Sequence, residues 1–256
     1  MIKTGVIGAA GKMGIQVVSA VLNDNETELV CAVDKFNKGK ELSPNVKIED
    51  DIKTALTTAK PDIVVDFTQP DTIYNNIKIY QELKIKSVIG TTGLKDSELQ
   101  EIEELSKKNN TGIIIAPNFS IGAILMMKFA AQASKYFSNA EIIEFHHNQK
   151  KDAPSGTAIK TAQLMAKNNT NFKLGNCKET ETLQGARGGN CNDIQIHAVR
   201  MPGFVASQEV IFGSDGQTLK IHHDTINREC YMSGVLLAVK HLYKNNTFIY
   251  GLENIL

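Results

Sequence analysis

The sequence predicts an α/β protein in which an N-terminal Rossmann-like domain with a parallel sheet precedes an α+β domain with a mixed sheet. Three observations predict this fold. Short apolar stretches alternate with helical stretches through the first half of the 256 residues. A glycine-rich turn separates the first strand from the first helix. Beyond Pro117 the pattern changes to successive short strands joined by turn residues.

The first half contains five expected strands and three expected helices. The strands are expected at 2–7, 29–33, 63–67, 87–89 and 112–115. The helices are expected at 12–22, 71–83 and 96–107. Apolar strands separated by helices of this length pair in parallel, because right-handed crossovers place helices on both faces of the sheet.

The second half alternates less regularly. We expect helices at 121–136, 157–166 and 230–243, and strands at 140–146, 194–198, 208–212 and 219–223. The turn residues between the last three strands indicate an antiparallel or mixed sheet. We therefore expect a dinucleotide-binding domain at residues 1–118, to which residues 229–256 return, and a substrate-binding domain at residues 119–228.

The composition excludes several classes of protein. Lys and Arg together number 28, as do Asp and Glu, so the net charge is zero and we expect no nucleic-acid partner. The apolar runs are too short to cross a bilayer, and the N-terminus lacks the features of a signal peptide, so we expect a cytoplasmic protein without a membrane partner. The four cysteines are widely spaced, which favours reduced thiols and no metal site: Cys31, Cys177, Cys191 and Cys230.

The glycine turn G-A-A-G-K-M-G at 8–14 predicts a dinucleotide site. Glycine lets the backbone turn tightly and lets a pyrophosphate approach the N-terminus of the following helix, where free N–H groups favour anions. Asp34 ends the second expected strand twenty residues after Gly14, where a carboxylate can bind the adenosine ribose. A glycine turn alone would also fit an ordinary strand–helix loop; its combination with Asp34 favours the dinucleotide.

The choice between NADH and NADPH stays open. Asp34 favours the free 2′-hydroxyl of NADH, because a carboxylate repels a 2′-phosphate. Lys35 follows directly, with Lys12 and Lys38 close in sequence, and a lysine there could neutralise that phosphate. We expect both cofactors to be used.

Three further loops follow expected strands, and each would border the nicotinamide because ligands of open α/β sheets lie beyond the carboxyl ends of the strands. These loops are Asp66-Phe67-Thr68, Gly90-Thr91-Thr92-Gly93 and Ala116-Pro117-Asn118-Phe119.

The stretch 144–157, E-F-H-H-N-Q-K-K-D-A-P-S-G-T, indicates a site for an acidic ligand. Ser155, Gly156 and Thr157 open a helix, where N–H groups and hydroxyls suit one carboxylate. Lys150 and an imidazole suit a second acid group or a proton donor. Neighbouring residues of a strand point to opposite faces, so the adjacent histidines share one site only if the strand ends there.

These motifs resemble dihydrodipicolinate reductase over nearly the whole chain. The stretches that carry the resemblance are 8–14, D-F-T at 66–68, G-T-T-G at 90–93, A-P-N-F-S-I-G at 116–122, E-F-H-H-N-Q-K at 144–150, D-A-P-S-G-T at 152–157, H-A-V-R-M-P-G at 197–203 and Q-E-V-I-F-G at 208–213. The pairing of E-x-H-H-x-x-K with D-A-P-S-G-T is very specific to this family.

The resemblance implies roles for individual residues. His146 is the expected acid/base group and Lys150 the expected proton donor. The expected substrate-binding residues are Thr92, His147, Ser155, Gly156 and Thr157. The expected cofactor-binding residues are Gly8, Ala9, Ala10, Gly11, Lys12, Met13, Asp34, Lys35, Gly90, Thr91, Thr92, Ala116, Pro117, Asn118 and Phe119.

The chain departs from some family members at three positions. Gln69 replaces an arginine after D-F-T, and Asp34 and Lys35 replace Glu and Arg, so the cofactor choice stays open. Arg228 lies where the family carries an arginine near the domain junction. The resemblance also implies a homotetramer assembled through the sheet of the second domain.

The implied reaction is the NADPH- or NADH-dependent reduction of a cyclic dicarboxylate, 4-hydroxy-tetrahydrodipicolinate or its dehydrated form, to tetrahydrodipicolinate in the diaminopimelate and lysine pathway. We expect the substrate to enter a cleft between the domains that closes around it. Two alternatives remain: a related two-domain dehydrogenase that acts on an amino-acid-derived imine, and a dinucleotide sensor without catalysis.

Overall fold

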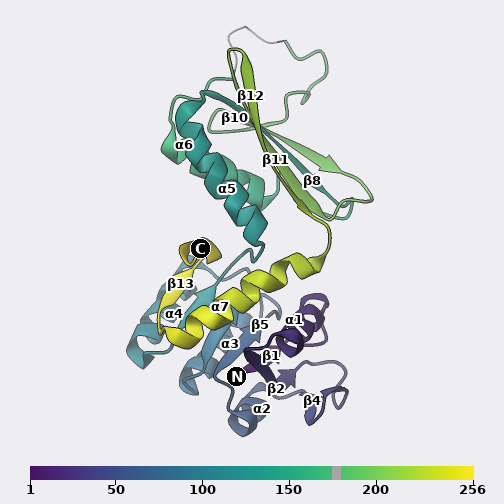
Figure 1. Cartoon of the computed structure of the whole chain (residues 1–256), viewed down its shortest axis with the longest axis vertical. Helices are drawn as coiled ribbons and strands as arrows, with labels where there is room; N and C mark the ends of the chain where they lie inside the picture. Colours follow the sequence, from purple (N-terminus) through teal and green to yellow (C-terminus); the bar gives the residue numbers. More distant parts are fainter. Residues whose placement is uncertain (175–179) are drawn as a thin grey trace. The chain divides into compact units, whose positions relative to one another are not determined.

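The computed structural model describes residues 1–174 and 180–256, which form two compact units. The first unit contains Met1–Ile121 and Arg228–Leu256, and the second contains Gly122–Asn227. Both are shown in Figure 1, where the colours follow the sequence.

The first unit is built on an eight-stranded sheet with the order β13-β7-β6-β5-β1-β2-β4-β3. Its strands are β1 (Ile2–Ile7), β2 (Thr27–Val33), β3 (Glu41–Ser43), β4 (Val46–Glu49), β5 (Ile63–Asp66), β6 (Lys86–Ile89), β7 (Ile113–Ile115) and β13 (Phe248–Tyr250). All neighbouring strands pair in parallel except β3 with β4. The chain passes from β1 to β2 on one side and later to β5 on the other, so the order reverses beside β1, where α/β sheets bind ligands.

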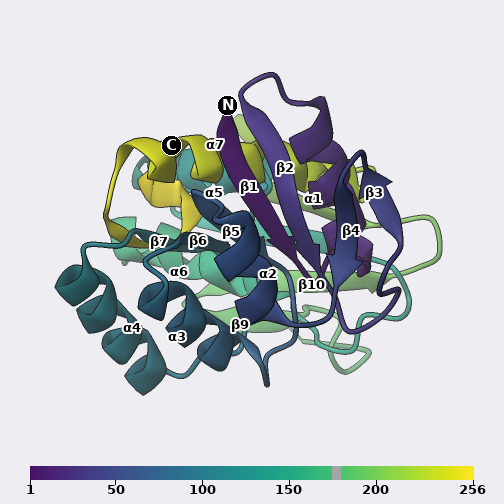
Figure 2. The same ribbon diagram turned by 90° about the horizontal axis from the view of Figure 1, so that it is seen from below.

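Helices cover both faces of this sheet (Figure 2). The helices are α1 (Lys12–Asn23), α2 (Ile52–Ala59), α3 (Ile73–Glu82), α4 (Asp96–Asn109) and α7 (Met232–Lys244). The buried apolar side chains of α2, α3 and α4 form one cluster with those of the strands, including Leu56, Ile77 and Ile102. On the other face α1 contacts α7, and α7 contacts β5, β6 and β7. Two-sided coverage explains why the central strands β5 and β7 are buried along their whole length.

The C-terminal segment belongs to the first unit. The 3₁₀ turn η2 (Arg228–Tyr231) leads into α7, β13 then pairs with β7, and the 3₁₀ turn η3 (Leu252–Asn254) follows. Lys86 fixes the end of α7 by donating to the carbonyl oxygens of Leu242 and Tyr243 at 2.7 and 3.1 Å. Burial lowers the pKa of this lysine.

The second unit packs helices on one face of a mixed five-stranded sheet with the order β12-β11-β8-β10-β9. Its elements are α5 (Ile121–Ala133), the 3₁₀ turn η1 (Ser134–Tyr136), β8 (Asn139–His146), α6 (Gly156–Asn168), β9 (Gly189–Cys191), β10 (Ile194–Arg200), β11 (Ala206–Ser214) and β12 (Gln217–Thr225). The β8–β10 pair is parallel and the others are antiparallel. Alternate residues of β8, Ala140 and Ile142, pack in the core with Ala158 and Ala162 of α6.

The structure confirms the predicted fold class: a Rossmann-like, mostly parallel sheet followed by an α+β unit with a mixed sheet. Two expected helices differ at one end. The expected helix 121–136 is α-helical to Ala133 and ends as a 3₁₀ turn, and the expected helix 230–243 starts as a 3₁₀ turn and becomes α-helical at Met232. Within the described ranges, no helix combines the length and apolar character needed to span a membrane.

Candidate active site

The glycine turn after β1 is shaped by steric necessity. Gly8 has φ +81°, and a Cβ atom added there would lie 2.7 Å from the carbonyl oxygen of Phe67. A Cβ atom at Gly14 would lie only 1.9 Å from the carbonyl oxygen of Gly8. Glycine at position 14 therefore lets the first turn of α1 pack directly against the end of β1, and glycine at position 8 lets the turn approach the loop after β5.

The N-terminus of α1 presents unused backbone donors. Gly11 is the N-cap residue and has no side chain to cap the helix, and the first intrahelical bond runs from Ile15 N to Gly11 O at 3.0 Å. The N–H groups of Lys12, Met13 and Gly14 consequently lack a partner within the helix. Such a helix start favours a phosphate group.

Asp34 ties the ends of β1 and β2 together. One carboxylate oxygen accepts a hydrogen bond from Ala10 N and the other from Phe36 N, both at 2.9 Å. Each oxygen has a further lone pair, so the carboxylate can also accept a hydrogen bond from a hydroxyl group. Asp34 therefore both holds the turn and is available to a ribose.

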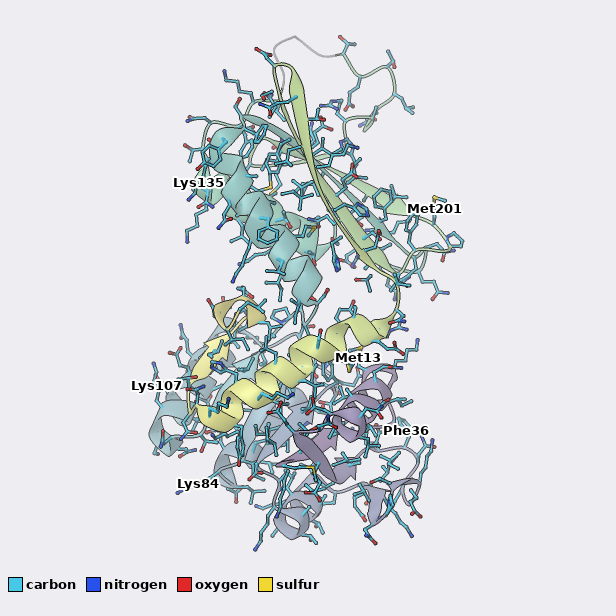
Figure 3. All side chains as sticks on the ribbon, in the orientation of Figure 1. Met13, Phe36, Lys84, Lys107, Lys135 and Met201 are labelled. Carbon is cyan, nitrogen blue, oxygen red and sulfur yellow. The ribbon has the colours of Figure 1, made fainter. Side chains whose placement is uncertain are left out.

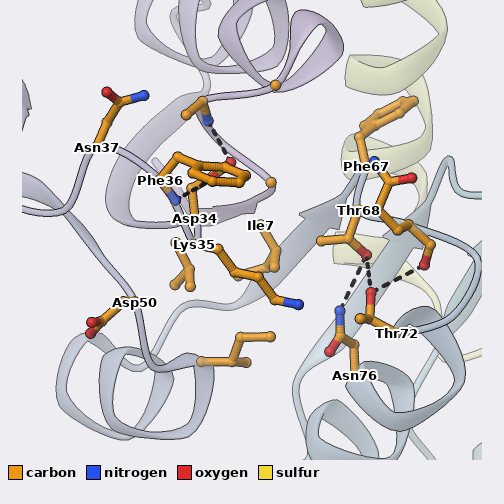
Figure 4. Close-up of a pocket in the computed structure, with 16 residues that line it drawn as sticks. Ile7, Asp34, Lys35, Phe36, Asn37, Asp50, Phe67, Thr68, Thr72 and Asn76 are labelled. Carbon is orange, nitrogen blue, oxygen red and sulfur yellow. Dashed lines mark hydrogen bonds between the residues drawn. The ribbon is translucent and has the colours of Figure 1, made fainter.

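A cavity of about 470 Å³ lies over the ends of β1, β2 and β5 (Figure 4). Its lining includes five of the expected cofactor-binding residues and the neighbouring Phe36: Gly8, Ala10, Gly11, Asp34, Lys35 and Phe36. The cavity suits the adenosine and phosphate portion of a dinucleotide in volume, in helix-start donors and in its carboxylate. Phe36 is 74% exposed and projects from the surface of the first unit (Figure 3).

The lysines at the cavity differ in their partners. Lys38 forms an ion pair with Asp50 at 2.7 Å, and this contact raises the pKa of Lys38. Lys35 extends into the cavity in Figure 4 and makes no ion pair within the described parts of the chain. Lys35 is therefore the better placed of the two to meet a 2′-phosphate.

A buried carboxylate fixes the loop after β5. Asp66 accepts hydrogen bonds from Tyr80 Oη at 2.6 Å, Asn76 Nδ2 at 3.0 Å and Thr68 N at 2.8 Å. Burial raises the pKa of Asp66, and these hydrogen bonds oppose that effect. The network anchors the loop to α3, and so shapes the cavity wall.

The other two strand-end loops pack beside it. The rings of Phe67 and Phe119 lie 5.6 Å apart, and a Cβ atom at Gly90 would approach the Phe67 ring to 2.1 Å. Asn118 Oδ1 accepts a hydrogen bond from Ser120 N at 2.8 Å. A smaller cavity of about 30 Å³ is lined by Thr91, Thr92, Pro117 and Tyr250, among others.

The expected cofactor residues thus form two groups in the first unit. Gly8, Ala10, Gly11, Asp34 and Lys35 line the large cavity, and Thr91, Thr92 and Pro117 line the small one. Ala9, Lys12, Met13, Gly90, Ala116, Asn118 and Phe119 belong to the same loops or to the start of α1 but line neither cavity.

The second unit places the His-His segment at a strand end. β8 ends at His146, and Lys150 N donates to His147 O at 3.2 Å, which closes a tight turn. Because β8 ends at His146, the strand does not force His146 and His147 onto opposite faces of the sheet. His146 is mostly buried, with its Nδ1 atom 2.5 Å from Glu144 Oε2, whereas His147 is exposed.

Lys150 is held by a neighbouring carboxylate. Its Nζ atom donates to both oxygens of Asp152, at 2.7 and 2.8 Å. The Lys150 side chain is 20% exposed and that of Asp152 is 64% exposed. The contact lowers the pKa of Asp152. An anionic ligand would compete with this exposed carboxylate for the lysine.

The start of α6 provides a second set of unused donors. Ser155 is the N-cap residue, and its Oγ atom accepts a hydrogen bond from Ala158 N at 3.2 Å. The N–H groups of Gly156 and Thr157 precede the first intrahelical bond and stay available. Apart from its two chain neighbours and the backbone of α6, no heavy atom of the described residues would lie within 4 Å of a Cβ atom at Gly156. The helix therefore begins against open space.

Sequence reasoning missed the carboxylate that connects these parts. Glu144 is fully buried, and Arg200 donates to both of its oxygens at 2.7 Å. Burial alone would raise the pKa of Glu144, but hydrogen bonds from His146, Arg200 and Ser155 outweigh it and lower the pKa to about 2. The alternation of β8, which points Ala140 and Ile142 inward, was the available signal that Glu144 is inward too.

The sequence also predicts reduced thiols and no metal site. The described residues contain no group of His, Cys, Asp and Glu side chains arranged to hold a metal ion. Among the described residues, Cys31, Cys191 and Cys230 form no disulfide bond, and Cys177 lies outside the described residues. Arg228 is exposed at the start of η2.

Comparison with known proteins identifies the family. The N-terminal model of dihydrodipicolinate reductase matches residues 2–119, and the C-terminal model matches residues 122–256. The chain belongs to the dihydrodipicolinate reductase family. The 4-hydroxy-tetrahydrodipicolinate reductase of Lysinibacillus sphaericus is 46% identical over 263 residues, which cover 100% of this chain and 99% of that protein.

Solved structures agree with membership of this family. A dipicolinate-bound dihydrodipicolinate reductase from Paenisporosarcina sp. TG-14 has a TM-score of 0.92 and 42% identity, with 100% of each chain covered. An amine dehydrogenase from Mycobacterium smegmatis has a TM-score of 0.67 at 11% identity, with 98% of this chain and 95% of that chain covered. At such low identity this second likeness shows a common fold alone.

Proposed function

We propose that this chain catalyses the NAD(P)H-dependent reduction of 4-hydroxy-tetrahydrodipicolinate to tetrahydrodipicolinate in diaminopimelate and lysine biosynthesis. The single observation that carries the proposal is the segment 144–157. It combines a carboxylate-bound histidine, a lysine and a helix start capped by Ser155 within one connected structure. Near-full-length similarity to reductases of this name supports the same reaction.

The proposed substrate site lies in the second unit and recognises two carboxylates. The N–H groups of Gly156 and Thr157, with the Thr157 hydroxyl, would hold one carboxylate. Lys150 and His147 would hold the other, with Lys150 leaving Asp152 to do so. Ser155 supports this site as the N-cap residue, and Thr92 is a further residue proposed to bind the substrate. The dipicolinate bound in the Paenisporosarcina enzyme is a ligand of this class.

The proposed cofactor site lies in the first unit, the dinucleotide-binding domain. The helix-start donors after Gly11 would hold the pyrophosphate, and Asp34 would bind the ribose. The loops after β6 and β7, with Thr91, Thr92 and Pro117, would border the nicotinamide. When bound, the reduced nicotinamide supplies the hydride.

The chain's own residues supply the proton. The hydroxylated substrate loses water and gains one hydride and one proton, and His146 and Lys150 are the proposed donors of that proton. Glu144 holds the His146 ring through Nδ1, which leaves Nε2 to face a ligand. The positive charge of Lys150 would stabilise negative charge that develops on the substrate.

We propose that both NADH and NADPH serve. Asp34 suits the 2′-hydroxyl of NADH, and Lys35 suits the 2′-phosphate of NADPH. Gln69 lines the same cavity without adding a charge. Steady-state kinetics with each cofactor measure the preference.

We also propose a cytoplasmic homotetramer assembled through the second unit's sheet. The face of this sheet opposite α5 and α6 carries the apolar side chains Ile143, Phe145, Val199 and Ile211, all of them partly exposed in the single chain. The absence of a disulfide bond among the described cysteines suits a reducing compartment. Light scattering should give the mass of four 28.1 kDa chains.

A single assay tests the proposed reaction. The purified chain is mixed with NADPH or NADH and 4-hydroxy-tetrahydrodipicolinate, and the loss of reduced-nicotinamide absorbance is followed. We expect turnover with this substrate and little with acyclic imines of amino acids. Preferential turnover of such imines would indicate a different dehydrogenase, and cofactor binding without turnover of any of them would indicate a sensor.

A further inference from the structure

Glu144 is a buried carboxylate whose hydrogen-bonding capacity is filled by three parts of the second unit. Oε2 contacts His146 Nδ1 at 2.5 Å and accepts from Arg200 Nη1 at 2.7 Å. Oε1 accepts from Arg200 Nη2 at 2.7 Å and from Ser155 N at 3.0 Å. The four contacts occupy all four lone-pair positions of the carboxylate. Glu144 therefore connects β8, β10 and the start of α6.

This arrangement determines which ring nitrogen of His146 carries a proton. An ionised carboxylate accepts hydrogen bonds and donates none. The contact at Nδ1 therefore requires an N–H group there, in the neutral ring as in the charged one. The remaining nitrogen, Nε2, is the atom that exchanges a proton with a ligand.

The same carboxylate positions the helix start. Ser155 donates its backbone N–H to Glu144, and its Oγ atom caps α6. The N–H groups of Gly156 and Thr157 follow directly. A displacement of Glu144 would thus move both the imidazole and the donors of α6.

We propose that Glu144, held by Arg200, is the positioning residue of the active site. It keeps His146 in the Nδ1-protonated form and holds the start of α6 in a fixed position relative to the His146 ring. This inference rests on the proposed function. Glu144 touches neither substrate nor cofactor, and it acts through His146 and Ser155.

The substitution Glu144→Gln tests the proposal because it keeps the shape of the side chain. A glutamine amide has one accepting oxygen and one donating nitrogen. Arg200 Nη2 and Ser155 N both donate to the Oε1 position, which therefore takes the oxygen. The nitrogen then faces His146 and stabilises the ring with an unprotonated Nδ1 atom. We expect kcat to fall about 10- to 100-fold, the scale for residues that orient a reacting group through hydrogen bonds, with an unchanged KM for the cofactor.

Nitrogen-15 NMR shows which ring nitrogen of His146 carries the proton. This position would not change if Glu144 had only a structural role. The spectra of the histidine ring nitrogens are recorded at a pH where imidazoles are neutral, and the His146 signals are assigned with a His146→Gln sample. In the unsubstituted protein they should show a protonated Nδ1 atom at His146. In Glu144→Gln the proton should move to Nε2. The variant Glu144→Asp retains the charge and should keep the Nδ1 proton, with partial activity.

Glu141 provides a matched control on the same strand. Its carboxylate contacts His197 Nε2 at 2.7 Å and Arg187 at 2.6 Å, so it resembles Glu144 in its partners. Glu141→Gln should change the His197 spectrum and leave kcat unchanged. Burial of the Glu144 site makes the comparison informative, since Glu141 is 37% exposed and Glu144 is 0% exposed.

Two results would overturn the proposal. One is a protonated Nε2 and bare Nδ1 at His146 in the unsubstituted protein, which can be measured even if Glu144→Gln does not fold. The other is a folded Glu144→Gln variant with unchanged kcat and unchanged His146 spectrum. The spectra need no turnover, so absence of reductase activity in the unsubstituted protein would refute the proposed function and leave this assignment to be decided by NMR.

Discussion

The substitution Arg200→Met should destabilise the second unit because it leaves Glu144 buried without the guanidinium group that donates to both of its oxygens. The Glu144 side chain is 0% exposed and the Arg200 side chain is 19% exposed. The fall in the Glu144 pKa from 4.5 to about 2 corresponds to about 3 kcal/mol of stabilisation shared among its contacts. Removal of one partner of a buried ion pair typically costs about 3–5 kcal/mol. We therefore expect the free energy of unfolding to fall by about 3 kcal/mol at neutral pH.

The effect should depend on pH in a defined direction. The folded-state pKa of Glu144 is lowered, so its contribution is fully present above the unfolded pKa of 4.5 and is lost as the pH falls toward about 2. Arg200→Met removes part of this contribution. The difference between the two proteins should thus be largest near neutral pH and should shrink on acidification.

Urea unfolding followed by circular dichroism, at one protein concentration, measures the difference. Lys220→Met is the control, because Lys220 pairs with Glu209 at 3.0 Å in the same sheet with its side chain 59% exposed. An exposed pair contributes about 0–1 kcal/mol. An Arg200→Met variant that is as stable as Lys220→Met at neutral pH would refute the reasoning.

Three further predictions follow from the glycines and Lys35. Gly156→Ala should raise the substrate KM about tenfold, a loss of about 1.4 kcal/mol in binding free energy, without lowering thermal stability. The control is Gly213→Ala, where an added Cβ atom also lies in open space; this variant should leave the substrate KM unchanged. Lys35→Ala should raise the KM for NADPH about 2- to 5-fold, the scale of one exposed ion pair, and leave the KM for NADH unchanged; equal changes would contradict its role. Gly14→Ala should abolish cofactor binding in calorimetry, since its Cβ atom would lie 1.9 Å from Gly8 O; near-normal affinity would show that the turn can relax.

The long elements of the fold were predictable because their apolar residues follow a clear period. The first strand and the helices α1, α3 and α4 lie within two residues of the expected bounds at each end. The short strands β3, β4, β9 and β13 have three or four residues each. So short a segment carries no measurable period, and its pairing depends on strands distant in the sequence.

The candidate site was predictable in its chemical groups but not in its connections. The glycine turn, Asp34 and the 144–157 segment could be read from residue type and spacing. Glu144 was part of a quoted motif, but its burial depends on pairing between β8 and its neighbours. Its partner Arg200 lies 56 residues away, and sequence spacing cannot show that the two meet. The Lys150–Asp152 contact is local, yet it depends on side-chain rotamers that composition does not determine.

The central claim is that His146 and Lys150 form the proton-donating part of a reductase for a cyclic dicarboxylate. The most direct test is kcat for His146→Ala and Lys150→Ala, measured at saturating NADPH and 4-hydroxy-tetrahydrodipicolinate. We expect each variant to fold, to bind the cofactor normally and to lose about 10²-fold or more in kcat, the usual scale for acid–base groups. Unchanged kcat in both folded variants would contradict the account.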